Sequence, residues 1–208
     1  MWSNVMLRFP SKPYPVPLHS RDTVLRLARH EVGHMIAAKV FGFKTGDITV
    51  ELTDLHGGYR GGAKIFLSRP LRNLDEVTGC LGDRTVVLWA GAVAESLKDQ
   101  KADQTAACAC LKSEAGRQDH AKATELLNLL RNLRFPDAQS KEESQAGLTA
   151  IEHEIWEQTV AVVEVEEALI VGMAEGIARM VKLTAKQYTL SEAEIAATPN
   201  IIKRFAPK

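Results

Sequence analysis

The stretch His30-Glu31-Val32-Gly33-His34 decides how the surrounding chain folds. It reads H-E-x-x-H inside an apolar segment, and at 3.6 residues per turn His30 and His34 lie one above the other on one face of a helix. Their imidazoles can therefore converge on a single tetrahedral zinc ion. Glu31 is rotated from His30 by about 100°, so its carboxylate can reach a water that zinc activates rather than the metal. Glutamate takes that proton in known proteases with this motif.

The helix that carries the motif is predicted to begin near Ser20 or Asp22, either of which can cap it. It runs to Phe41, and Gly42 is a natural stop. A chance match on an amphipathic helix is the alternative to a metal site. Two histidines do not complete a catalytic zinc site, so the decision depends on a third ligand.

Composition indicates a water-soluble domain with a substantial core. The 208 residues include 26 basic and 26 acidic side chains, so the charge favours neither nucleic acid nor an anionic membrane. No apolar run approaches the roughly 20 residues that span a bilayer. The N-terminus lacks the basic start and apolar core of a secretory signal. We therefore expect a cytoplasmic protein without a membrane span or a nucleic-acid partner.

The three cysteines, Cys80, Cys108 and Cys110, are expected to be reduced thiols. A soft zinc site at Cys108-Ala109-Cys110 is a weaker alternative, because its third thiol would be distant.

The remaining pattern predicts a mainly α, α+β fold with a small sheet beside the motif helix and a C-terminal helical bundle. Four prolines predict an extended N-terminal arm over residues 1–19. Residues 20–208 are expected to form one domain, with its zinc-site half at 20–136 and its helical part at 148–208. The expected strands are Asp47–Leu52 and Ala63–Leu67. The expected helices are Leu74–Lys98, Arg117–Leu133, one or two within Leu148–Lys182, and a short one that a capping box at Ser191–Glu194 begins and Pro199 stops. Residues 99–115 are expected to form a loop with at most a short helix, and 137–147 a polar linker.

Four side chains downstream of the motif are candidates for the third ligand: Glu95, Asp103, Asp119 and His120. Glu95 is expected at the end of a buried helix, whereas Asp119 and His120 are expected near the start of another. The residues alone leave this choice open.

The sequence resembles the FtsH-type (M41) zinc peptidases, the protease domains of membrane-bound ATP-dependent proteases. His30–Met35 resembles their H-E-A-G-H-A, Ala90–Glu95 resembles their G-G-R-x-A-E, and Asp119–Thr124 is similar to their D-x-x-x-A-T. The resemblance covers about residues 20–200. It implies a zinc site made by His30, His34 and Asp119. It also implies that Glu31 is the general base.

Glu95 is then expected to be a structural or metal-supporting residue. His120 is rotated by about 100° from Asp119 on a helix and is expected at the surface. Two imidazoles and a carboxylate favour Zn²⁺ over cobalt or manganese. The expected function is that of a zinc metalloendopeptidase acting on unstructured polypeptide. The alternative is a catalytically weak binding or regulatory module that keeps the metal.

The sequence also departs from the family. Ala92 stands where the family has arginine, Ser96 replaces a second glutamate, and residues 98–116 align poorly. No G-x-x-x-x-G-K-[ST] phosphate loop occurs in the 208 residues, so we expect this chain to act without ATP. The sequence leaves open whether it forms a homo-oligomer or works with a separate ATPase. The strand around Ile48–Leu52 is the expected edge for an extended substrate to pair with.

Overall fold

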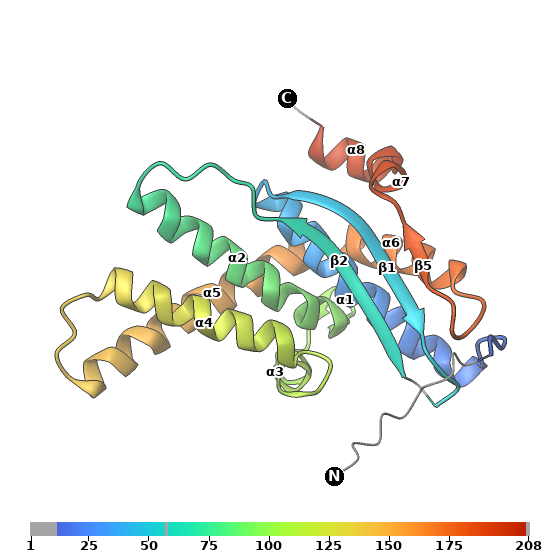
Figure 1. Cartoon of the computed structure of the whole chain (residues 1–208), viewed down its shortest axis with the longest axis horizontal. Coiled ribbons are helices and arrows are strands. Elements are labelled where there is room, and N and C mark those ends of the chain that lie inside the picture. The colour runs from blue at the N-terminus through green and yellow to red at the C-terminus, as the bar shows by residue number, and fades with distance from the viewer. Residues whose placement is uncertain (1–11, 57, 207–208) are drawn as a thin grey trace, which may run out of the picture.

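The motif helix α1 (Arg21–Val40) runs through the centre of the molecule (Figure 1). The figure shows a computed structural model that describes residues 12–56 and 58–206. Every residue from His30 to Ala38 is buried, because the sheet covers one side of α1 and the helices α2 (Leu74–Glu95) and α6 (Glu167–Met180) cover others. The predicted helix is confirmed, with Gly42 just beyond its end at a φ of 73°.

A three-stranded antiparallel sheet lies against α1, in the order β2-β1-β5. Its strands are β1 (Lys44–Leu52), β2 (Tyr59–Phe66) and β5 (Tyr188–Leu190). Ile48, Val50 and Leu52 are almost fully buried, as their alternation with polar residues predicts. The two N-terminal strands are therefore confirmed, although both are longer than predicted.

The expectation that Ile48–Leu52 forms a free edge is wrong. Ile48 pairs with Ala63 of β2 on one side and with Leu190 of β5 on the other, so β1 is the central strand. Among the described residues, no strand pairs with the outer edge of β2. β5 comes from nearly 140 residues further along the chain, and this long-range pairing is invisible to local sequence patterns.

On the other side of α1, α2 (Leu74–Glu95) packs along the motif helix and against α4 (Arg117–Arg134) and α5 (Lys141–Val165). A second apolar cluster joins these three helices. Its fully enclosed members include Val86, Leu127 and Ile155. α2 stops at Glu95, three residues earlier than predicted, because Leu97–Lys98 (β3) turns back onto Lys101–Ala102 (β4).

Two other helix boundaries differ from the prediction. The polar linker is shorter than 137–147, because Ser140 and Glu143 form a capping box that begins α5 at Lys141. α3 (Gln104–Lys112) fills much of the segment predicted as a loop, and the Asp103 carboxylate caps it.

The C-terminal part contains two long helices rather than one. α5 ends at Val165 and α6 (Glu167–Met180) follows it directly. The capping box at Ser191 is confirmed and begins α7 (Glu192–Ala197). Pro199 does not only stop that helix: it occupies the first turn of α8 (Pro199–Phe205), where its missing N–H costs nothing.

The described part of the N-terminal arm runs alongside residues 182–184. The Val16 N–H donates to the Lys182 carbonyl, and the Thr184 N–H donates to the Tyr14 carbonyl. Residues 18–20 form a short 3₁₀ turn that leads into α1, and residues 1–11 lie outside the described residues.

The fold is therefore mainly helical with a small antiparallel sheet, as predicted. None of the helices within the described residues is both long enough and apolar enough to cross a membrane.

Candidate metal centre

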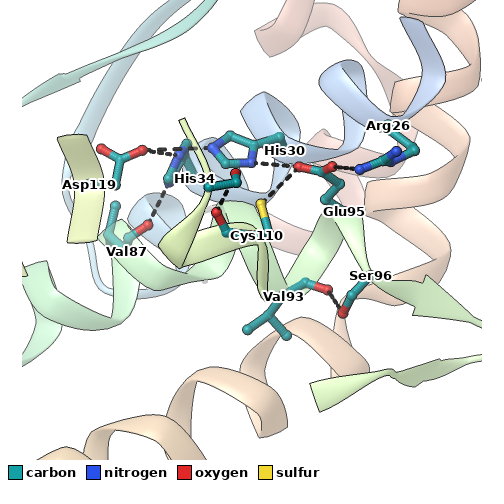
Figure 2. Close-up of polar contacts among 10 residues, drawn as sticks. Arg26, His30, His34, Val87, Val93, Glu95, Ser96, Cys110 and Asp119 are labelled. Carbon is teal, nitrogen blue, oxygen red and sulfur yellow. Dashed lines mark hydrogen bonds and ion pairs between the residues drawn. The ribbon is translucent and has the colours of Figure 1, made fainter. Parts of the chain in front are cut away.

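His30, His34 and Asp119 meet where α1, α2 and α4 come together (Figure 2). Asp119 Oδ2 lies 3.2 Å from His34 Nε2 and 3.7 Å from His30 Nε2. Ligands of a tetrahedral zinc ion, with bonds of about 2.0–2.1 Å, are about 3.3 Å apart. The two distances to Asp119 are close to that value, and all three donor atoms lie within 4.8 Å of one another.

The outer nitrogen of each ring is already committed to a hydrogen bond, which leaves Nε2 for a metal. His34 Nδ1–H donates to the Val87 carbonyl over 2.7 Å, and His30 Nδ1–H donates to Glu95 Oε2 over 3.2 Å. Both acceptors lack a hydrogen, so each Nδ1 carries the proton and each Nε2 has the free lone pair when its ring is neutral. This is the usual arrangement of metal-binding histidines and their supporting acceptors.

Glu95 lies on the side of His30 opposite Asp119, and its carboxylate contacts the Nδ1 of that ring rather than the Nε2 (Figure 2). Its carboxylate also accepts a hydrogen bond from Arg26 at 2.5 Å and one from the Cys110 thiol at 3.2 Å. Burial alone would raise the pKa of Glu95, but its hydrogen bonds, with that from His30 foremost, lower it to about 2. A charged Glu95 thus fixes the tautomer and the orientation of the His30 ring.

The electrostatics of the cluster favour a cation at its centre. Burial raises the pKa of Asp119, but hydrogen bonds from the two histidines outweigh it and hold the pKa well below its usual range. Burial lowers the pKa of His30, yet its bonds to Asp119 and other acceptors raise it overall. A proton and a metal ion therefore compete for the space between Asp119 and the His30 ring.

Glu31 lies beside the cluster on the side of β2. Burial raises the pKa of its carboxyl group, and the Ala63 N–H of β2 donates a hydrogen bond to it. A carboxylate whose pKa is shifted toward neutrality is suited to accepting and releasing a proton.

Two glycines allow this close assembly. A Cβ on Gly91 of α2 would lie 2.4 Å from His34 Nε2, and a Cβ on Gly61 of β2 would lie 2.3 Å from Glu31 Oε1. The sequence alone did not connect Gly91 with the imidazoles or Gly61 with Glu31.

The other sequence candidates lie elsewhere. Asp103 caps α3 and His120 is exposed on α4, as its helical position predicted. Cys108 is exposed and does not join Cys110 in a metal-binding group of the described residues. Cys110 instead forms a group with His30 and Glu95, a contact that the sequence did not indicate.

No known protein-family model matches this chain, and no curated protein matches it. The resemblance to the M41 peptidases therefore rests on the motif residues quoted above.

Proposed function

We propose that this protein is a zinc-dependent metallopeptidase of the M41 type. The observation that carries the proposal is the meeting of two imidazole nitrogens and one carboxylate oxygen, at separations that fit zinc, beside a buried glutamate. Three protein ligands leave a fourth position for water or substrate, which distinguishes catalytic zinc sites from closed structural ones.

In this proposal His30, His34 and Asp119 hold the zinc ion, and Glu95 and the Val87 carbonyl keep the imidazoles in place. Zinc supplies a Lewis acid that polarises the scissile carbonyl and activates water at neutral pH. Glu31 accepts the proton of the attacking water and passes it to the leaving amine. The Ala63 backbone opposes the effect of burial and favours the charged form of Glu31.

The proposed substrate is an extended, unstructured polypeptide. The outer edge of β2, rather than Ile48–Leu52, is the place where such a chain can add as a further strand. Gly61 on β2 touches Glu31, so a segment paired to this edge would pass next to the proposed base. Because the 208 residues contain no phosphate loop, we propose that ATP is not required for cleavage by this chain.

The test compares the zinc-loaded protein with Glu31→Gln on a quenched-fluorescent unstructured peptide. The nearly isosteric amide should keep one zinc per chain and lower the cleavage rate by about 10²–10⁴-fold. Glu125→Gln, on the exposed side of α4, is the matched control and should change neither. If the wild-type protein binds zinc but cleaves nothing, the peptidase proposal fails and a metal-dependent binding module remains.

A further inference from the structure

Arg84 of α2 has a partly buried guanidinium group whose Nη1 has no hydrogen-bond partner among the described residues. Its Nη1 is enclosed and makes no hydrogen bond, and no ion pair among residues 12–56 and 58–206 involves this side chain. The adjacent Asp83 does not neutralise it, because Asp83 pairs with Arg69 over 2.7 Å. A guanidinium group offers five N–H donors, and leaving a buried donor unpaired is unfavourable. The unpaired Nη1 of Arg84 therefore suggests that this side chain binds a ligand.

The position of Arg84 on α2 places it on the side that faces the metal centre. Arg84, Val87 and Gly91 are spaced by three and four residues, so they share one face of the helix. The Val87 carbonyl holds His34, and Gly91 touches both imidazoles. Arg84 therefore continues the same face about one turn beyond Val87, at the opposite end of the centre from Glu95.

The charges around Arg84 leave room for an anion. Burial lowers the pKa of Arg84, and the nearby groups that oppose this effect are Asp119 and Cys80. Asp119 Oδ2 lies within ion-pair distance of both imidazoles, and Lys122 Nζ lies 4.0 Å from Asp119 Oδ1. Once Asp119 serves a divalent cation, its charge no longer balances Arg84 and Lys122. That end of the centre then carries unneutralised positive charge.

We propose that Arg84 is a substrate-recognition residue that binds a carboxylate of the polypeptide close to the bond that is cut. The planar guanidinium group suits a carboxylate because two parallel N–H···O bonds can form. The carboxylate comes either from an acidic side chain or from the C-terminus of the substrate. This inference rests on the proposed peptidase function and specifies its substrate class.

The experiment measures peptide binding to zinc-loaded Glu31→Gln, which holds substrate without cutting it. Unstructured peptides are compared in pairs that differ only by Glu against Gln at one position, or by a free against an amidated C-terminus. A carboxylate in the right place should tighten binding by about tenfold or more, corresponding to about 1.4 kcal/mol. The pair that shows the effect identifies the source of the carboxylate.

Three second-site variants connect that preference to Arg84. Arg84→Gln should remove it without changing the affinity for the neutral peptide, and Arg84→Lys should keep part of it. Arg72→Gln is the control, because Arg72 is highly exposed on the loop that precedes α2. Zinc content is measured for each variant.

The inference is overturned if the protein shows no preference for either carboxylate, or if the preference survives in Arg84→Gln. An equal loss for acidic and neutral peptides together with zinc loss would also overturn it, since Arg84 would then support Asp119. If Arg84→Gln does not fold, the paired peptides are compared on Arg84→Lys instead. An undiminished preference for the carboxylate in Arg84→Lys would then overturn the inference. Failure of the peptidase function is recognised separately, by a wild-type protein that binds these peptides but cleaves none.

Discussion

Gly91→Ala tests whether the close packing of α2 under the imidazoles is a condition for metal binding. The added methyl carbon would lie 2.4 Å from His34 Nε2 and 2.8 Å from His30 Cδ2. Favourable contacts between heavy atoms are about 3.5–4.0 Å, so the rings or the helices must move by about 1 Å. α1 and α2 are packed closely here, because a Cβ on Gly33 would lie 2.5 Å from Ala94 Cβ, and separating them would break these contacts. We therefore expect the His34 ring to move and to weaken its bond to Val87.

The expected effect on zinc is larger than the effect on stability. Displacing a supporting group of a metal site typically lowers metal affinity by about 10–100-fold, and Gly91→Ala moves a ligand itself. Replacing a helical glycine by alanine gains up to about 1 kcal/mol, whereas overpacking costs about 1–3 kcal/mol. The metal-free variant should thus lose about 0–3 kcal/mol of unfolding free energy.

The assay is zinc titration against a competing chelator, with urea unfolding of the metal-free protein alongside. Gly82→Ala is the matched control on the same helix, because no atom lies within 4 Å of a Cβ placed there. This control should keep its zinc affinity. Zinc binding by Gly91→Ala as tight as that of the control would refute the reasoning about the centre.

Three further predictions concern the ligands, the base and the substrate. Asp119→Ala should lose zinc almost completely, whereas Glu95→Gln should weaken it by only about 10–100-fold; zinc analysis showing the reverse order would remove Asp119 as a ligand. Gly61→Ala should keep zinc and slow peptide cleavage, because its Cβ would displace the Glu31 carboxylate; an unchanged turnover number would contradict this. A destabilised form of one substrate protein should be cleaved faster than its folded form, with no effect of ATP, because global unfolding costs about 5–15 kcal/mol; equal rates or ATP stimulation in a gel assay would count against it.

The sequence by itself determined the features that depend on neighbours along the chain. The spacing of His30 and His34 places both rings on one helical face, whatever surrounds the helix. The Ser191 capping box began a helix because its bonds are local. The alternation of Ile48, Val50 and Leu52 identified a strand and its buried face.

Local pattern also misled where tertiary contacts decide. A strand pattern does not say whether one or both edges of the strand are paired. The second edge of β1 pairs with β5, which lies far along the chain. The capping box at Ser140 begins α5 seven residues before the predicted helix. The prediction missed it because the box lies in the segment predicted as a polar linker.

Only the tertiary structure decided which residues surround the centre. Gly91 lies about 60 residues from the motif, yet the crossing of α1 and α2 presses it against both imidazoles. Cys110 reaches Glu95 because α3 packs beside α2, and the Nη1 of Arg84 is enclosed without a hydrogen bond among the described residues. Helical periodicity fixes the direction of a side chain from its own helix, but a contact between helices depends on how they cross, and that is set by the packing of the whole core.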